Sequence, residues 1–268
     1  MSTVVMGILN VTPDSFSDGN KFIDSERACS HALEMIKQGA DIIDIGGEST
    51  RPGSDPVSEE TELNRVIPVI EMIRNHSEIP ISIDTNKSVV AEKAINAGAD
   101  IVNDISALTF DLRMTSVVAR SNAPVILMHI KGTPKNMQEN PGYTDIVSEI
   151  IQYFQDRIEY SITQGISKEN IILDPGIGFG KSVEDNFTIL KNIYEFRKLG
   201  YPILVGPSRK SFIGATLNRN VDDRLLGTAA AVSASIMNGA DIIRVHDVDE
   251  MSQISIISDK ISKYKEGN

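Results

Sequence analysis

Eight short apolar runs recur along the 268-residue chain, and amphipathic segments separate each run from the next. The runs predict strands at residues 4–9, 41–45, 81–84, 100–103, 125–129, 170–174, 203–206 and 241–246. The clearest helical patterns cover residues 25–38, 58–74 and 144–164, and Ser58 with Thr61 and Glu62 resembles an N-terminal cap. Strand and helix alternate throughout, which is typical of a parallel sheet covered by helices.

A short motif, Gly-Ala-Asp followed by two apolar residues, occurs at residues 39–43, 98–102 and 239–243. Each copy predicts a helix that ends at glycine and leads directly into a buried strand. The copies are about two and then about four strand-helix units apart, so they fall at the second, fourth and eighth strands.

These patterns favour a single (β/α)8 TIM-barrel domain over residues 1–268, since such barrels have roughly 250 residues. A doubly wound open sheet remains the alternative, because alternation alone does not show that the sheet closes.

Composition narrows the classes of partner. Lys and Arg number 26 against 37 Asp and Glu, and the net charge of -11 argues against nucleic acid or an anionic membrane as the partner. No apolar run reaches the roughly 20 residues that cross a bilayer, and the N-terminus lacks the features of a signal peptide. The single cysteine, Cys29, lies in a helical pattern and is expected to pack in the core. We therefore expect a cytoplasmic protein.

Polar residues follow several of the predicted strands at the end where a barrel builds its active site. They are Asn10, Asp84, Asn103, His129, Asp174, Arg244 and His246. The loop after Asp174 carries glycines at 176, 178 and 180 and then Lys181, but this spacing matches neither a P-loop nor a dinucleotide fingerprint.

Asp174 and its neighbours suggest one half of a ligand site. A carboxylate at a strand end can accept two parallel hydrogen bonds from an amidine-like edge, such as that of a 2-aminopyrimidinone ring. Asn103 and Asp84 offer complementary groups from nearby strands. Taken singly, each of the three is as readily a strand-end cap or a loop hydrogen bond.

Arg244 and His246 suggest the other half. They share parity in the last strand and therefore face the same side of the sheet, where a guanidinium and an imidazole suit a phosphate or pyrophosphate. A structural salt bridge from this pair to Asp247 or Asp249 is the alternative. The Arg209-Lys210 pair and Arg51 support a local anion site in an otherwise acidic chain.

Two loops, residues 10–19 and 46–53, follow strands and are rich in turn-forming residues and hydrogen-bonding groups. Such loops can close over a reaction and exclude water. Phe16 in the first loop suggests an aromatic ligand.

Five blocks of the sequence, residues 6–19, 46–53, 174–181, 208–211 and 244–247, closely resemble the dihydropteroate synthase family. The resemblance spans nearly the whole chain and implies a TIM barrel, commonly a homodimer, that uses Mg2+. It implies a transferase of folate biosynthesis, a target of sulfonamides, which joins p-aminobenzoate to the pterin of 6-hydroxymethyl-7,8-dihydropterin pyrophosphate and releases pyrophosphate. The products would be 7,8-dihydropteroate and pyrophosphate.

The resemblance also implies roles for individual residues. The pterin pocket would comprise Asp84, Asn103, Met128, Asp174, Phe179 and Lys210. The pyrophosphate pocket would comprise Asn10, Thr50, Arg51, Arg244 and His246, with Asn10 also contacting the magnesium. The aminobenzoate would lie beside Phe16, Pro52, Phe179, Lys210 and Ser211. Catalytic roles would fall to Asp84, Lys210, Arg244 and His246.

Two other functions are compatible with a pterin pocket. A pterin-dependent methyltransferase domain would share the pocket but would have no use for Phe16 and Arg51. A non-catalytic pterin-binding module would not need Asn10, Arg244 and His246. A pyrophosphate-release assay separates these alternatives from the synthase.

Overall fold

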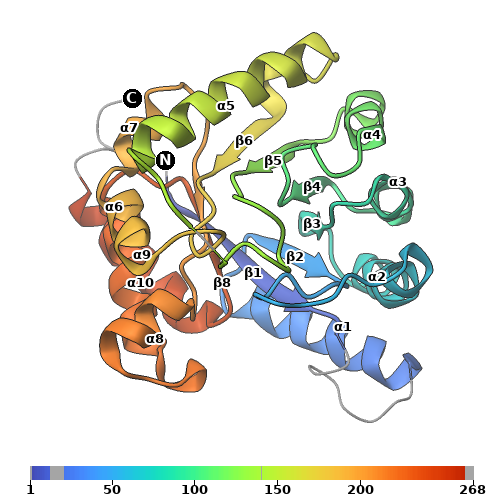
Figure 1. Ribbon diagram of the computed structural model, residues 1–268. Coiled ribbons are helices and arrows are strands. Elements are labelled where there is room, and N and C mark those ends of the chain that lie inside the picture. The colour runs from blue at the N-terminus through green and yellow to red at the C-terminus, as the bar shows by residue number, and fades with distance from the viewer. Residues whose placement is uncertain (1, 13–20, 140, 263–268) are drawn as a thin grey trace.

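The computed structural model describes residues 2–12, 21–139 and 141–262 of the chain, without the side chains of residues 21–23. Eight parallel strands lie at the centre and helices surround them (Figure 1). In the described part of the chain, no helix is both long and apolar enough to cross a bilayer.

The first half of the chain alternates strictly between strand and helix. Its elements are β1 (Val4–Asn10), α1 (Lys21–Lys37), β2 (Ile42–Gly46), α2 (Glu59–Arg74), β3 (Ile81–Asp84), α3 (Ser88–Ala97), β4 (Ile101–Asp104), α4 (Arg113–Ser121) and β5 (Val125–Met128). All five strands lie within a residue or two of the predicted runs. The predicted cap of α2 is also confirmed, because the Ser58 side chain accepts a hydrogen bond from the Thr61 N–H.

The second half contains extra short helices. Its elements are α5 (Ile146–Thr163), the 3-10 turn η1 (Lys168–Asn170), β6 (Ile171–Asp174), α6 (Val183–Lys191), α7 (Ile193–Arg197), β7 (Leu204–Val205), α8 (Ser211–Leu217), η2 (Val221–Asp223), α9 (Leu225–Met237), β8 (Ile242–Val245) and α10 (Val248–Ile261). β7 is shorter than the predicted run at 203–206, since only two of its residues pair with β8.

The strand order is β6-β5-β4-β3-β2-β1-β8-β7, and every neighbouring pair is parallel. A bridge from Leu173 in β6 to Ile203, just before β7, joins the two ends of the sheet. The sheet is therefore a nearly closed TIM barrel, and the open doubly wound alternative is wrong.

The Gly-Ala-Asp motif has one structural role in all three places. Each glycine has a positive φ, between 102° and 114°, and ends its helix. Each aspartate then accepts a hydrogen bond from a backbone N–H at or just before the start of a neighbouring strand: Asp41 from Val5, Asp100 from Ile81 and Asp241 from Ile203, at 2.8, 2.8 and 3.0 Å. These carboxylates satisfy donors at the N-terminal end of the barrel, opposite the polar strand ends.

Two apolar layers hold the barrel together. Side chains from six of the eight strands fill its interior: Met6, Ile42, Ile101, Ile126, Leu204 and Ile242. A larger cluster lies between the strands and the helices, and Cys29 is buried in it as a free thiol, as predicted. Because the interior is packed up to the C-terminal strand ends, a ligand can enter only above them.

Candidate active site

A cavity of about 570 Å3 opens at the C-terminal ends of the strands. Residues from β1, β3, β8 and the loops after β2, β6 and β7 line it. Those predicted from the sequence are Asn10, Thr50, Arg51, Pro52, Asp84, Phe179, Lys210, Ser211, Arg244 and His246. Phe16 lies outside the described residues.

A narrow recess of about 20 Å3 continues below this cavity and shares Asp84, Lys210 and Arg244 with it. Its lining adds the remaining predicted residues, Asn103, Met128 and Asp174, together with Ile105 and Ile177. Every described residue to which the resemblance assigns a role therefore lines either the cavity or the recess.

Arg244 lies between two carboxylates at the base of this cavity. Its Nε donates to Asp44 Oδ2 at 2.6 Å, and one terminal nitrogen donates to Asp84 Oδ2 at 2.7 Å. The alternative of a salt bridge from Arg244 to Asp247 or Asp249 is wrong, because these partners come from β2 and β3. The two ion pairs fix the plane of the guanidinium at the floor of the cavity.

Asp44 is the residue that sequence reasoning missed. It is fully buried in β2, and Asn103 Nδ2 donates to its two oxygens at 3.2 and 3.4 Å. Asp44 therefore links Arg244 to Asn103 and orients both. A charged residue within the apolar run Ile42-Ile43-Asp44-Ile45 was the available signal, since a buried carboxylate requires partners.

The two carboxyls nearest the recess are held in different ways. Asp174 is 6% exposed, and its Oδ1 accepts a hydrogen bond of 2.7 Å from the Gly176 N–H. Burial raises the pKa of Asp174 to about 6, although Lys210 and Arg244 act in the opposite direction. Burial also raises the pKa of Asp84 to about 7, against the influence of Arg244. Both carboxyls gain from a ligand that donates hydrogen bonds to them.

His246 is held by Ser208, which lies in the block 208–211 but was given no role from the sequence. Ser208 Oγ lies 2.9 Å from His246 Nδ1, and the His246 backbone N–H donates to the same oxygen at 3.2 Å. Burial and the nearby cations lower the pKa of His246 to about 3, so the ring is neutral. In the tautomer in which the hydroxyl donates to Nδ1, the ring proton is on Nε2 and can be donated to a ligand.

The basic residues of the cavity differ in how they are used. The Arg209 guanidinium is already paired with Asp247 at 2.5 Å, so it is less available to a ligand than the sequence suggested. Lys210 Nζ lies 4.1 Å from the centre of the Phe179 ring, and burial lowers the pKa of Lys210 to about 8. Basic residues outnumber acidic ones in the lining of the cavity, although the chain has a net charge of -11: Arg51, Arg209, Lys210, Arg224 and Arg244 against Asp84 and Asp222.

The loop after β2 is anchored on both sides of Thr50, Arg51 and Pro52. On one side, Glu48 Oε2 lies 2.7 Å from Lys87 Nζ, which also contacts the buried Glu62 at 2.6 Å. On the other side, the Gly53 N–H donates to the Pro134 carbonyl at 3.0 Å. The loop is thereby held against the cavity that these three residues line.

His129 corrects one prediction. It was expected to face the shared cavity with the other polar strand ends, but it lines neither the cavity nor the recess. Its ring packs edge-on against Tyr153, and its Nδ1 lies 3.0 Å from Lys181 Nζ. Because it follows Met128, which lines the recess, its side chain points to the opposite face of the strand end.

No cluster of three or more His, Cys, Asp or Glu side chains suitable for a metal ion occurs among the described residues. Asn10, whose side chain has an amide oxygen, lines the cavity. Mg2+ keeps several waters and takes ligands from substrate phosphates, so one protein oxygen suits an ion that arrives with a phosphorylated ligand.

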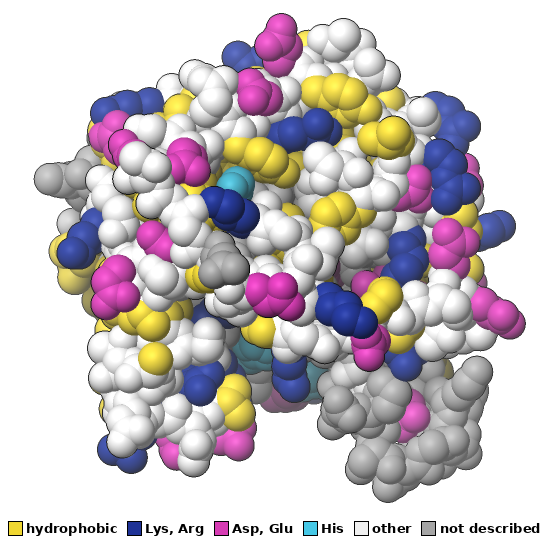
Figure 2. Space-filling model, viewed as in Figure 1, with side chains coloured by type: hydrophobic (Ala, Val, Ile, Leu, Met, Phe, Trp, Pro, Cys, Tyr) yellow, Lys and Arg dark blue, Asp and Glu magenta, His cyan; other side chains and the backbone are white. Residues whose placement is uncertain are grey.

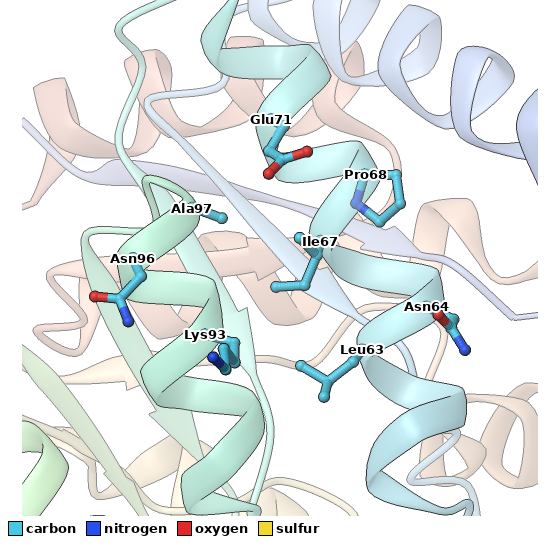
Figure 3. A pocket seen from close by; sticks show the side chains of 8 residues that line it. All are labelled: Leu63, Asn64, Ile67, Pro68, Glu71, Lys93, Asn96 and Ala97. Atoms are coloured by element: carbon cyan, nitrogen blue, oxygen red, sulfur yellow. The ribbon is translucent and has the colours of Figure 1, made fainter.

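Two other surface features are an external groove and the distribution of charged side chains. A groove of about 460 Å3 lies between α2 and α3 on the outside of the barrel (Figure 3), lined by Leu63, Asn64, Ile67, Pro68, Glu71, Lys93, Asn96 and Ala97. On the face seen in Figure 2, basic side chains are dispersed among acidic and polar ones, unlike the stripe typical of nucleic-acid binding.

Comparison with known proteins agrees with this geometry. Residues 6–246 match the family model described as "Pterin binding enzyme". The chain is 50% identical over 260 residues to a dihydropteroate synthase from Synechocystis, covering 97% of this chain and 90% of that protein.

Two solved structures are also similar. A dihydropteroate synthase from Yersinia pestis in a sulfonamide drug complex superposes with a TM-score of 0.92 at 44% identity, covering 97% of this chain and 94% of that one. A dihydropteroate synthase from Xanthomonas albilineans in complex with 7,8-dihydropteroate gives a TM-score of 0.88 at 38% identity, with 98% and 94% covered.

Proposed function

The chain belongs to the dihydropteroate synthases of the pterin-binding enzyme family, and we propose that its strand-end cavity joins a pterin to p-aminobenzoate. The reaction is a transfer in folate biosynthesis: 6-hydroxymethyl-7,8-dihydropterin pyrophosphate and p-aminobenzoate give 7,8-dihydropteroate and pyrophosphate. The observation that carries the proposal is that a recess lined by Asp84 and Asp174 opens into a larger cavity with an excess of basic residues.

The recess suits the pterin ring. Asp174 retains free lone pairs beside the Gly176 bond, so it can accept hydrogen bonds from the ring nitrogen and amino group. Asn103 is held by Asp44 and presents its amide oxygen, while Met128 and Phe179 supply apolar walls. Since the recess is smaller than a bicyclic ring, we expect Lys210 to move away from Phe179 when the ring enters.

The larger cavity above the recess suits the pyrophosphate. Arg244, already oriented by its two carboxylates, provides positive charge, and His246 donates from Nε2 as a neutral ring. Thr50 and Arg51 approach from the anchored loop after β2, and Asn10 would hold a Mg2+ ion that the pyrophosphate carries. When bound, that ion would neutralise part of the charge on the leaving group.

The aminobenzoate would lie between the loop after β2 and the start of α8, beside Pro52, Phe179, Lys210 and Ser211. The C–O bond of the pterin methylene breaks, and its electron pair leaves with the pyrophosphate. The aromatic amine then forms the new C–N bond and loses a proton. Among the residues that contact substrates, Asp84, Lys210, Arg244 and His246 act on the developing charges, and the protein mainly supplies orientation and electrostatics.

A homodimer belongs to the same proposal. Exposed large apolar side chains concentrate on α8 to α10, which include Leu217, Leu226, Met237, Ile256, Ile257 and Ile261. A stable interface needs upwards of about 1,000 Å2 with an apolar centre, and this surface supplies such a centre. Sedimentation of the parent and of Ile257→Glu tests it: a dimer that becomes a monomer is expected. A cytoplasmic location is consistent with Cys29, a free buried thiol.

An assay of pyrophosphate release tests the proposed function. Release should require both the pterin pyrophosphate and p-aminobenzoate, and it should stop when a chelator removes Mg2+. Release without aminobenzoate would contradict the synthase, and binding of both ligands without turnover would indicate a non-catalytic module. Methyl transfer to a corrinoid protein in place of release would indicate the methyltransferase.

A further inference from the structure

Lys181, at the end of the glycine-rich loop after β6, has no part in the cavity described above. Its side chain is 3% exposed and points into the protein. Its Nζ lies 2.9 Å from the Phe179 carbonyl, 3.2 Å from the His129 carbonyl and 3.0 Å from His129 Nδ1. Within the described residues, no carboxylate lies within ion-pair distance of Lys181.

The contacts of Lys181 join the segment after β5, residues 129–131, to the glycine-rich loop, residues 176–180, and the two backbones lie very close to each other. A Cβ at Gly176 would lie 2.0 Å from the His129 carbonyl oxygen, and one at Gly180 would lie 2.5 Å from the Lys131 carbonyl oxygen. Both glycines also have positive φ, at 69° and 65°. The carbonyls of the two segments therefore converge in a buried space, where unpaired acceptors would be costly.

The same loop carries the wall of the recess. Asp174 accepts from the Gly176 N–H at its start, and the Phe179 ring lies over the recess beneath Lys210. We propose that Lys181 is a positioning residue of the pterin site: its buried ammonium ties the end of β5 to the glycine-rich loop and thereby fixes Asp174 and Phe179 for the ring. This inference rests on the proposed function, because it assumes that the recess binds a pterin.

The charge of Lys181 adds a second effect. Burial raises the pKa of Asp174 to about 6, and Lys210, Arg244 and Lys181 each lower it. Burial lowers the pKa of Lys181 to about 7, Lys210 acts in the same direction, and Asp174 and Asp185 oppose it. The neutral His129 ring adds no charge. Between about pH 6 and about pH 7, Lys181 is therefore protonated while Asp174 is ionised, and the ammonium favours the carboxylate that the pterin requires.

Lys181→Met and Lys181→Gln test the inference, because glutamine keeps a hydrogen-bond donor without the charge. Lys131→Met is the matched control, since Lys131 is an exposed cation on the neighbouring segment. The measurement is calorimetric binding of 6-hydroxymethylpterin across about pH 5 to about pH 7.5, with the aminobenzoate KM, kcat and melting temperature of each variant.

Lys181→Met is expected to weaken pterin binding about tenfold or more near pH 6.5. The pH below which pterin affinity falls, the acid limb of the binding profile, should move to a higher value because Asp174 loses a nearby positive charge. The KM for aminobenzoate should change little. Lys181→Gln should recover part of the affinity but keep the shifted limb. If the methionine variant does not fold, the glutamine variant alone decides.

The inference is overturned if both Lys181 variants bind the pterin with the affinity and acid limb of the parent. It is also overturned if Lys131→Met causes the same losses, since loss of any neighbouring positive charge would then have the same effect on pterin binding. Absence of pterin binding in the parent would instead refute the proposed function and is distinguishable from either result.

Discussion

Replacing Asp174 with asparagine should weaken the pterin and stabilise the protein at once. The amide oxygen can still accept from the Gly176 N–H, so the loop is retained. The other oxygen becomes an NH2 group that faces a ligand donor and leaves it unpaired, at a cost of about 1–3 kcal/mol. We therefore expect pterin binding to fall about tenfold to about a hundredfold near pH 7.

The gain in stability follows from the pKa of the carboxyl. Burial raises the pKa of Asp174 from 3.8 to about 6, so the ionised carboxylate destabilises the folded state. This penalty is absent below about pH 4, grows as the pH rises, and is complete above about pH 6. The shift in pKa then corresponds to a loss of at most about 3 kcal/mol in the free energy of unfolding. Asparagine carries no such penalty. The unliganded variant should melt a few degrees above the parent, up to about 8 °C, at pH 7 and close to it at pH 4.

Thermal unfolding at the two pH values, paired with calorimetry of a pterin ligand, measures both effects. Asp145→Asn is the control, because Asp145 caps α5 on the surface and its pKa is lowered, so its loss should cost stability and leave binding unchanged. An Asp174→Asn variant that binds the pterin as tightly as the parent would refute the reasoning. So would a variant whose melting temperature, relative to that of the parent, is lower at pH 7 than at pH 4.

Three further outcomes are expected. Ser208→Ala should reduce kcat several-fold and leave pterin-ring binding intact, because the hydroxyl 2.9 Å from His246 Nδ1 is lost. Steady-state kinetics and calorimetry check this, and equal losses in kcat and in binding would indicate a folding effect. Gly176→Ala should destabilise the protein by more than about 1 kcal/mol in denaturant unfolding, since its Cβ would lie 2.0 Å from a backbone oxygen; an unchanged midpoint would contradict the close approach. A sulfonamide should compete with p-aminobenzoate, and Phe16→Leu should raise the inhibition constant more than the aminobenzoate KM; noncompetitive inhibition of the parent would contradict this position of the aminobenzoate.

Much of the barrel was predictable because its strands are apolar runs punctuated by glycine. The three Gly-Ala-Asp copies marked helix ends by the φ that glycine allows, and the aspartates proved to cap neighbouring strands. The closure of the sheet was not predictable in this way, because it depends on the pairing of Leu173 with Ile203 across a two-residue strand, a contact with no pattern in the sequence.

Site residues that end a strand could be predicted from the sequence. Residues whose orientation depends on an ion-pair partner elsewhere in the chain could be predicted less well. Asp84, Asn103, Asp174 and Arg244 were found by position, but the partners of Arg244 were not, since Asp44 lies far away along the chain. His129 ended a strand as well and yet faces away from the cavity. Successive side chains of a strand point to opposite faces, so His129 turns away from the recess that Met128 lines.

A single-turnover experiment tests the central claim most directly. The parent and Arg244→Met are each mixed with pterin pyrophosphate, p-aminobenzoate and Mg2+, and dihydropteroate and pyrophosphate are quantified together. We expect the parent to form the two products in equal amounts. The Arg244→Met variant should retain binding of the pterin ring and lose most of the rate. Pyrophosphate formed without dihydropteroate, or full activity in Arg244→Met, would contradict the account.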